Sequence, residues 1–234
     1  MSNGIKVKKR NGRGEEALNL EKMHKMVEEA TKGLAGVSAS QVEIQSGIQF
    51  YDGITTAEIQ DILIKSASDL ITLDNPNYQF VAARLLLFSI RKSLYGRTRE
   101  LPSLEEHIIK CVSQEVYDAD IYSKYSKEDI EKANGYIDHS RDFLFTYAGL
   151  RQVVDKYLVQ DRSTGKVYET PQFMYMMIAL TIFSEYPKQT RLNYVRRYYN
   201  AISKHKLNIP TPIMAGVRTP IRQFASCVLV DADD

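Results

Sequence analysis

Residues 78–95 read YQFVAARLLLFSIRKSLY, and this stretch decides how the first part of the chain folds. Large apolar side chains lie on nearly every side of a helix drawn through it: Val81, Leu85, Leu86, Leu87, Phe88 and Ile90. A helix that is apolar all round is buried rather than amphipathic. The stretch therefore predicts a central helix over residues 78–95, and Gly96 is placed to end it.

The segment nearest the N-terminus predicts a β-hairpin. Residues 5–9 and 16–18 are typical of short strands, and Asn11-Gly12 between them is a strong turn signal.

Two further helices are expected before the central one. Asn19 is placed as the N-cap of a helix that starts at Leu20 and carries an apolar stripe. Thr55 or Thr56 caps the next helix. Residues 1–96 are therefore expected to form a small helical domain that begins with a β-hairpin.

A charged stretch that ends at Pro102 marks a domain boundary, and residues 97–234 are expected to form a second domain. Its expected elements are helices near 104–116 and 127–136, a hairpin of 157–160 and 166–169, a helix opened by Pro171, a helix over 190–205, a stiff Pro-interrupted connector over 209–220, and a buried strand over 224–230. The fold class expected is mainly α with small β-hairpins.

Composition excludes several classes of protein. The 31 Lys and Arg residues nearly balance the 29 Asp and Glu residues, so the totals indicate neither a nucleic-acid nor a membrane partner. The two cysteines form no CxxC motif, which argues against a zinc site or a disulfide framework. The apolar run over 173–183 is shorter than the ~20 residues of a membrane span. A cytoplasmic protein is expected.

Basic and hydroxyl-bearing residues in the first domain form a candidate anion site. Lys8, Lys9 and Arg10 lie at the hairpin, and Lys22, Thr56, Gln60 and Lys92 lie on the expected helices. A triphosphate needs cations and hydrogen-bond donors that converge from different elements. Composition alone favours the simpler interpretation of solvated surface lysines.

Residues 1–96 resemble the ATP cone that precedes the catalytic domain of ribonucleotide reductase large subunits. The resemblance is carried by Val7-Lys8-Lys9-Arg10-Asn11-Gly12, by Gln49-Phe50-Tyr51-Asp52-Gly53-Ile54, and by Ala82-Ala83-Arg84-Leu85 with Arg91-Lys92 and Tyr95-Gly96. It implies a site for ATP or dATP, with Mg²⁺ accompanying the nucleotide, that regulates the enzyme.

The resemblance also implies residue roles in that site. Lys9, Arg10 and Lys92 would meet the phosphates, Asn19, Lys22 and Val7 would line the pocket, Thr56 would contact phosphate or ribose, and Glu15 or Glu16 would be the acidic residue after the first turn. Gln60 stands where a close relative has His, so it keeps a hydrogen-bonding group at that position.

A second resemblance covers Pro210-Thr211-Pro212-Ile213-Met214-Ala215-Gly216-Val217-Arg218-Thr219-Pro220 and Arg222-Gln223-Phe224-Ala225-Ser226-Cys227-Val228-Leu229. It is similar to the substrate segment of aerobic class I reductases. Replacing a ribose 2′-hydroxyl by hydrogen consumes two electrons, which two thiols deliver by forming a disulfide. By this resemblance Cys227 is one catalytic thiol, Thr211 and Ser226 bind substrate, and Asp234 lies near the specificity-effector site.

The family has a ten-stranded α/β barrel, and this sequence holds only its expected first strand. The resemblance therefore implies several partners: the remaining C-terminal portion of the large subunit, a radical-generating small subunit that carries the metallocofactor, and thioredoxin or glutaredoxin as reductant. An oligomer is expected, and no metal ligand is expected in this chain. The sequence alone fits a cloned fragment as well as a naturally split subunit.

Three rival interpretations remain open at the sequence level. A free-standing nucleotide sensor can carry an ATP cone, but the repressor family that does so has a four-cysteine zinc ribbon. Anaerobic reductases also carry a cone, yet their substrate segment does not resemble residues 210–229. Residues 185–222 hold eight cations and one acid, with tyrosines interleaved, which would suit a nucleic acid. Cys111, His139 and His205 are expected to be structural.

Overall fold

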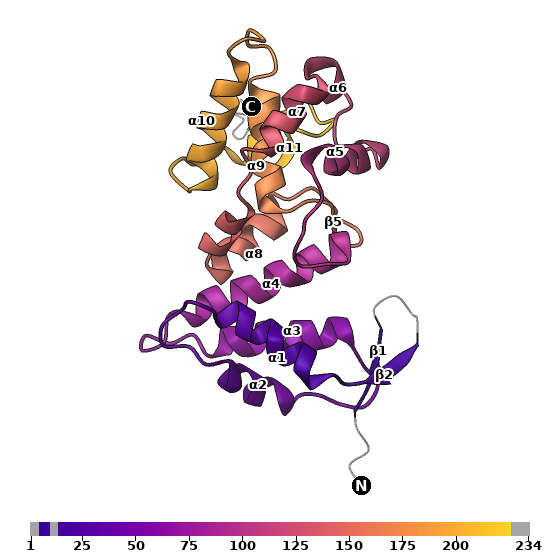
Figure 1. The fold of residues 1–234 in the computed structure, drawn as a ribbon, viewed down its shortest axis with the longest axis vertical. Helices are drawn as coiled ribbons and strands as arrows, with labels where there is room; N and C mark the ends of the chain where they lie inside the picture. Colours follow the sequence, from indigo (N-terminus) through magenta and orange to yellow (C-terminus); the bar gives the residue numbers. More distant parts are fainter. Residues whose placement is uncertain (1–4, 10–13, 226–234) are drawn as a thin grey trace, which may run out of the picture. The chain divides into compact units, whose positions relative to one another are not determined.

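The computed structural model describes residues 5–9 and 14–225, and its ribbon is drawn in Figure 1. The chain divides into two compact units. The first unit comprises Met1–Thr98 and Phe143–Arg151, and the second comprises Arg99–Asp142 and Gln152–Asp234. The chain is mainly helical with a few short strands, as its sequence predicts.

The first unit is built around α4 (Tyr78–Tyr95), which has the bounds expected from its apolar run. It packs against α3 (Thr56–Asp69) and α1 (Leu20–Thr31). Leu85 and Leu87 of α4 are fully buried. Gly96 ends the helix with a φ of +72°, a left-handed conformation that glycine adopts without a Cβ clash. The prediction of a buried central helix is confirmed.

Side-chain caps set where the surrounding helices begin. The Asn19 side chain accepts a hydrogen bond from the backbone N–H of Lys22 at 2.8 Å, so Asn19 is the N-cap of α1. Thr55 caps α3 through a capping box with Glu58, which settles the choice between Thr55 and Thr56. A further helix, α2 (Ala39–Gly47), was not predicted from the sequence.

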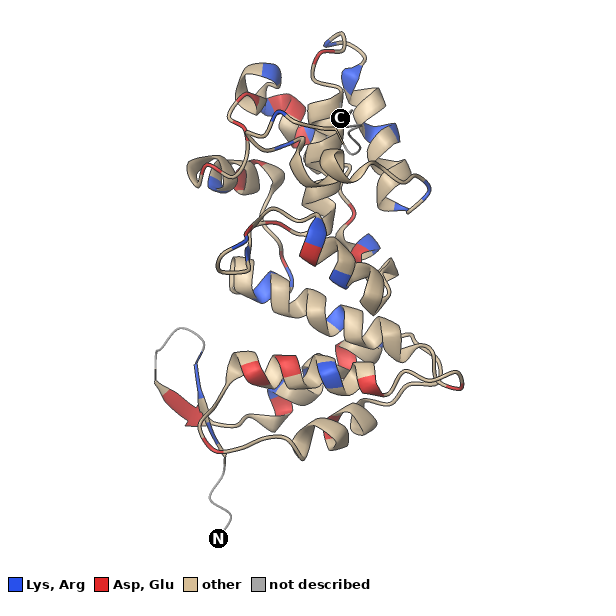
Figure 2. Cartoon of the chain, turned by 180° about the vertical axis from the view of Figure 1, so that it is seen from behind, with Lys and Arg blue, Asp and Glu red and all other residues tan. Residues whose placement is uncertain are grey.

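A three-stranded sheet lies beside these helices, with strand order β2-β1-β3. β1 (Lys6–Lys8) pairs antiparallel with β2 (Glu15–Ala17), as the hairpin prediction requires, and parallel with β3 (Ile54–Thr55), which was not predicted. In Figure 2 the ribbon of β1 is coloured blue where it carries lysine, and that of β2 is red where it carries glutamate. The predicted Asn11-Gly12 turn lies outside the described residues.

Phe143 joins the first unit although it lies far along the chain. Its ring meets Phe88 of α4 edge-on, with 6.2 Å between ring centroids. The guanidinium carbons of Arg84 and Arg91 lie 5.4 and 5.6 Å from the same ring centroid. The sequence assigned 143–151 to the second domain, whereas these residues cluster with the first unit.

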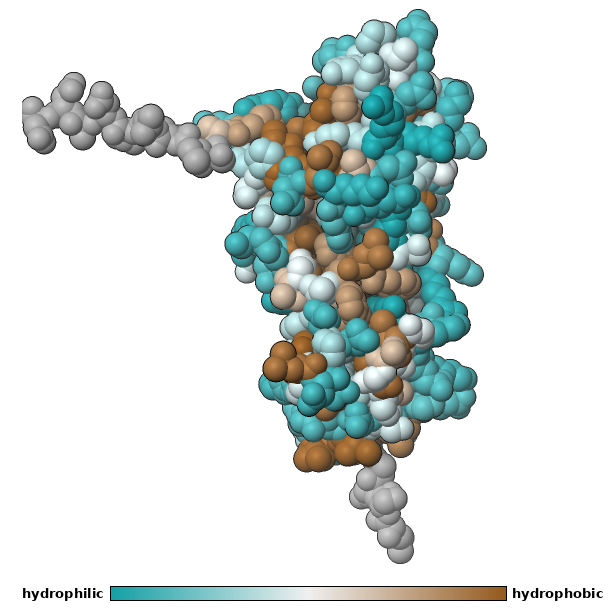
Figure 3. Space-filling model, turned by 90° about the vertical axis from the view of Figure 1, so that its left-hand side faces the viewer, coloured by the Kyte–Doolittle hydropathy of each residue, from teal (hydrophilic) through white to brown (hydrophobic). Residues whose placement is uncertain are grey.

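The second unit is helical around α9 (Pro171–Ile182), which is buried along most of its length and packs against α10 (Arg191–Ser203). The other elements from residue 99 onward are α5 (Leu104–Ser113), α6 (Ile121–Lys124), α7 (Lys127–Asn134), the 3-10 helix η1 (His139–Leu144), α8 (Tyr147–Lys156), β4 (Gln160–Asp161), β5 (Lys166–Val167) and α11 (Thr211–Gly216). Apolar residues, brown in Figure 3, also reach the surface in places.

The structure describes one of the two segments expected near the end of the second unit, and only the beginning of the other. The segment 209–220 is not simply a stiff connector, because it contains α11. Pro212 is tolerated there because it occupies the first turn, where a helix needs no backbone N–H. The strand expected over 224–230 lies largely outside the described residues. Within residues 5–9 and 14–225, no helix is long and apolar enough to cross a membrane.

Candidate functional site

A pocket of about 180 Å³ opens in the first unit beside the sheet and helices α1, α3 and α4; we call it the first-unit pocket. Seven of the ten residues expected to bind effector line it: Val7, Glu16, Asn19, Lys22, Thr56, Gln60 and Lys92. They come from five elements. The two that lie farthest apart in sequence, Val7 and Lys92, are separated by 85 residues. Folding therefore gathers residues that the sequence scatters.

Local structure explains how each polar group reaches the first-unit pocket. Asn19 and Lys22 lie at the N-terminus of α1, and Thr56 is the first residue of α3. Lys92 lies in the last turn of α4. A helix N-terminus carries a partial positive charge, and two of them meet here. Together with the lysines they make the pocket suited to an anion.

Glu16 is the acidic residue of the first-unit pocket. Its Oε2 lies 2.9 Å from Lys9 Nζ at the pocket rim. That hydrogen bond, together with the charges of Lys9, Lys22 and Lys92, lowers the pKa of the Glu16 carboxyl below its usual value. Three lysine charges therefore act on one carboxylate. Of the two acids left open by the sequence, Glu16 lines the pocket and Glu15 does not. Both are exposed, and Glu15 stands opposite Lys8 in the strand register.

Gln60 has a structural use as well as a place in the pocket. Its side-chain amide donates a hydrogen bond of 2.9 Å to the carbonyl oxygen of Leu85 in α4, and the residue is buried. Its donor is therefore engaged with the central helix. The apolar wall of the pocket, made by Ala17, Leu18, Met23, Met26 and Ile59, was missed by sequence reasoning because the methionines fit a core stripe equally well.

The predicted effector residues do not all line the pocket. Lys9 lies at the rim, where it is paired with Glu16, and Glu15 is not among the residues that line the pocket. Arg10 lies outside the described residues, as do Ser226, Cys227 and Asp234 of the second candidate site. Thr211, the remaining substrate residue, is exposed at the start of α11.

Behind α11 lies a buried polar network that the sequence did not indicate. Arg218 and Glu169 are paired with no exposed side-chain surface, and the Tyr117 hydroxyl donates to Glu169. His107 Nε2 lies 3.0 Å from the same hydroxyl, and burial lowers the pKa of His107 to about 3. Burial likewise raises the pKa of the Cys111 thiol to about 12, so this cysteine stays protonated and packs as a core residue.

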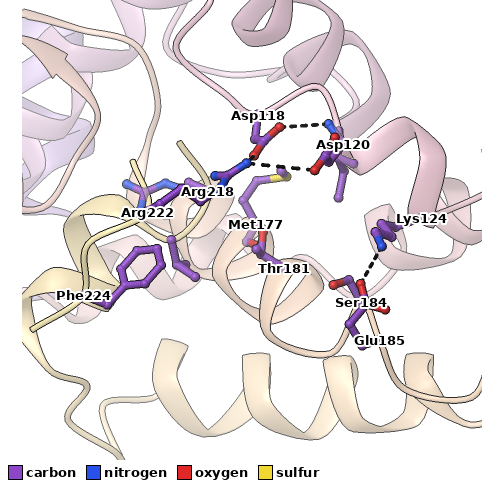
Figure 4. Close-up of a pocket in the computed structure, with 12 residues that line it drawn as sticks. Asp118, Asp120, Lys124, Met177, Thr181, Ser184, Glu185, Arg218, Arg222 and Phe224 are labelled. Carbon is purple, nitrogen blue, oxygen red and sulfur yellow. Dashed lines mark hydrogen bonds and ion pairs between the residues drawn. The ribbon is translucent and has the colours of Figure 1, made fainter. Parts of the chain in front are cut away.

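A second cavity, the second-unit pocket, has a volume of about 520 Å³. Figure 4 shows its charged walls: Arg222 is paired with Asp118, and Lys124 with Glu185. Ile121, Met177, Val217 and Phe224 supply its apolar lining. No sequence motif indicated this cavity.

The basic stretch over 185–222 is less basic at the surface than its composition suggests. Arg191 is nearly buried, with Nη2 2.6 Å from Asp129 Oδ2. Arg218 is buried against Glu169, and Arg222 is paired with Asp118. Three of its eight cations are therefore matched by carboxylates inside the second unit, which weakens the nucleic-acid interpretation. Among the described residues, no group of His, Cys, Asp and Glu is arranged to hold a metal ion.

Comparison with known families identifies both parts of the chain. Residues 5–93 match the ATP cone domain, and residues 143–222 match the family described as ribonucleotide reductase, all-alpha domain. The chain thus carries an ATP cone followed by a helical reductase domain. The second match favours a reductase over a free-standing nucleotide sensor.

Individual relatives are similar over the full chain. It is 49% identical over all its residues to the ribonucleoside-diphosphate reductase subunit alpha of Haemophilus influenzae, covering 31% of that protein. It is 48% identical to ribonucleoside-diphosphate reductase 1 subunit alpha of Escherichia coli, covering 30%. Against the subunit alpha of Enterobacteria phage T4 the identity is 46% over 85% of the chain and 26% of the relative. Over its whole length the chain is thus similar to the N-terminal region of ribonucleoside-diphosphate reductase alpha subunits.

Proposed function

We propose that this chain is the effector-sensing and substrate-contacting part of a ribonucleoside-diphosphate reductase. The observation that carries the proposal is the first-unit pocket, where seven predicted effector residues converge. The chain spans about 30% of the length of the first two relatives, so the activity belongs to a larger assembly. That assembly would replace the 2′-hydroxyl of a ribonucleoside diphosphate by hydrogen.

In this proposal the first-unit pocket takes ATP or dATP, with Mg²⁺ accompanying the nucleotide. Lys92 meets the phosphates, Lys9 joins it once its pair with Glu16 opens, and Lys22 lines the pocket. That exchange is energetically accessible because an exposed ion pair contributes only about 0–1 kcal/mol. Asn19 and Thr56 bring the two helix N-termini to the anion. Arg10 is proposed as a further phosphate contact.

The substrate would be bound along residues 210–229. Thr211 is exposed and can donate a hydrogen bond to a ligand. Ser226 is proposed as a second contact, and Cys227 as one of the two thiols that are oxidised to a disulfide while the ribose is reduced. Asp234 is proposed to begin the specificity-effector site.

The partners follow from the same proposal. The remaining C-terminal portion of the large subunit supplies the second thiol and the radical cysteine, and a small subunit supplies the radical through its own metallocofactor. Thioredoxin or glutaredoxin reduces the disulfide, and the enzyme works as a cytoplasmic oligomer without nucleic acid or membrane.

Reconstitution tests this function. The purified chain is mixed with a polypeptide that supplies the missing C-terminal portion and with the small subunit, and deoxynucleotide formation and co-elution are measured. We expect product only when all three are present with a dithiol reductant. A chain that reduces nucleotides unaided, or that ignores the complementary portion, would contradict the proposal.

A further inference from the structure

The buried pair of Glu169 and Arg218 is the feature from which a further role can be inferred. Arg218 Nε donates to both carboxylate oxygens, at 2.9 Å to Oε2 and 3.1 Å to Oε1, and Nη2 also donates to Oε1. Neither side chain is exposed. Burial alone would lower the pKa of Arg218, but the Glu169 carboxylate raises it above its ordinary value, so the guanidinium remains charged.

Further hydrogen bonds of this pair tie α11 to the segment that precedes β4. Arg218 Nη1 donates to the Met214 carbonyl oxygen at 2.6 Å, and Nη2 donates to the Tyr157 carbonyl oxygen at 2.8 Å. Glu169 accepts from the Val159 backbone N–H at 2.6 Å. One guanidinium therefore joins the C-terminal part of α11 to the chain that leads into the β4–β5 hairpin.

Stability alone does not account for such a pair. Two buried charges must be taken out of water, and well-packed apolar residues of similar volume are commonly as stable or more stable. Apolar residues cannot supply directional hydrogen bonds, whereas the planar guanidinium of arginine holds several acceptors in fixed positions at once. Direction matters for α11, since a six-residue helix is too short to hold itself by propensity.

We propose that Arg218, oriented by Glu169, is a positioning residue that fixes α11 and thereby places Thr211 for the substrate. Thr211 begins the helix whose Met214 carbonyl the guanidinium holds. The inference rests on the proposed role of Thr211 in substrate binding. The hold of Arg218 on α11 can be measured separately from that role.

The first test measures hydrogen exchange of the α11 amides in the chain alone. The double variant Glu169→Leu/Arg218→Met keeps an apolar, filled interior but removes the directional bonds. We expect its thermal midpoint to fall, because the Tyr117 hydroxyl, the Val159 N–H and the Tyr157 carbonyl lose buried partners. The α11 amides should exchange about tenfold faster or more, a larger change than in the rest of the second unit. Unchanged α11 exchange would overturn the inference. Should this variant fail to fold, Tyr117→Phe can be used, because it removes one hydrogen bond from Glu169. We then expect the α11 amides to exchange several-fold faster than in the wild type. Unchanged exchange in Tyr117→Phe would also overturn the inference.

The matched control replaces a different ion pair of the second unit by the same two apolar residues. Asp129→Leu/Arg191→Met removes another ion pair of the second unit, one that joins α7 to α10. We expect α11 exchange in this control to equal that of the wild type. Equal acceleration in both double variants would mean that α11 responds to general loosening, which would overturn the specific role.

The second test measures kinetics in the reconstituted reductase. We expect Glu169→Leu/Arg218→Met to raise KM for the ribonucleoside diphosphate about tenfold or more, since misplacing a contact by about 1 Å is costly. Here kcat should change much less, and effector affinity should be unaltered. A wild-type KM despite faster α11 exchange would overturn the positioning role. If the reconstituted wild-type enzyme formed no deoxynucleotide, the proposed function would be refuted instead. The hydrogen-exchange measurement would still show whether Arg218 holds α11.

Discussion

Lys9 Nζ lies 2.9 Å from Glu16 Oε2, so the end of β1 and the middle of β2 are joined by an ion pair at the rim of the first-unit pocket. The carboxylate therefore holds a lysine that the proposed triphosphate would recruit. Effector binding would therefore replace the Glu16 carboxylate by the triphosphate as the partner of Lys9.

The first prediction concerns this exchange. Glu16→Gln removes a negative charge from among three lysines, so we expect ATP measured without Mg²⁺ to bind more tightly, by up to about fivefold, because an exposed ion pair contributes little. Glu15→Gln, on the exposed neighbouring residue, is the control and should change affinity less. Weaker binding by Glu16→Gln would show that the carboxylate assists the ligand rather than competing with it.

The second prediction separates chemistry from regulation. Cys227→Ser should abolish multiple-turnover reduction in the reconstituted enzyme, because a hydroxyl cannot form the disulfide that takes up the two oxidising equivalents. Nucleotide binding at the first-unit pocket should be unaffected. Product that accumulated at the wild-type rate would remove Cys227 from the mechanism.

The third prediction tests how Phe143 is held. Phe143→Ala removes a ring that contacts Phe88 and two guanidinium groups, so we expect the free energy of unfolding of the first unit to fall by roughly 1–3 kcal/mol. Leu144→Ala, on the exposed neighbour, should change it by less than ~0.5 kcal/mol. Equal losses in the two variants, measured by urea unfolding, would mean that residue 143 is not an anchor.

The fourth prediction is a pH dependence from His107. Burial holds its pKa at about 3, whereas the unfolded residue has the ordinary histidine pKa of 6.5. Below about pH 6.5 the unfolded chain therefore binds a proton that the folded chain does not, and stability falls with pH down to about 3. Lowering the pH from 7 to 5 should cost about 2 kcal/mol through this residue.

His107→Gln is the comparison for that pH dependence. Glutamine can still meet the Tyr117 hydroxyl but does not titrate, so its unfolding free energy should depend less steeply on pH by that amount. Carboxylates titrate equally in both proteins and cancel in the difference. Parallel pH profiles for the two proteins would show that His107 is not held neutral by the fold.

Sequence reasoning succeeded where the signal is local. The apolar run over 78–95 predicts α4 with its bounds, and Asn19 predicts the start of α1, because burial and capping depend on neighbours in sequence. It missed β3, whose two residues are too few to show a period, and α2, which has few apolar positions.

Long-range pairings account for the rest. Nothing near Arg218 in sequence indicates that Glu169, 49 residues away, neutralises it in the interior. Charge counting therefore overestimated the basic surface between 185 and 222. For the candidate effector site, the resemblance named residues that the fold gathers in one pocket, yet only the structure distinguishes Glu16 from Glu15.

Calorimetric titration of the chain with ATP and dATP measures whether the first-unit pocket binds adenine nucleoside triphosphates, as proposed. We expect saturable binding that Lys92→Ala weakens by about 1.5–3 kcal/mol, the contribution of a charge-assisted hydrogen bond, or roughly ten- to a hundredfold in Kd. Lys204→Ala, an exposed lysine of the second unit, should leave Kd unchanged. Absence of binding, or equal affinity in wild type and Lys92→Ala, would contradict the account.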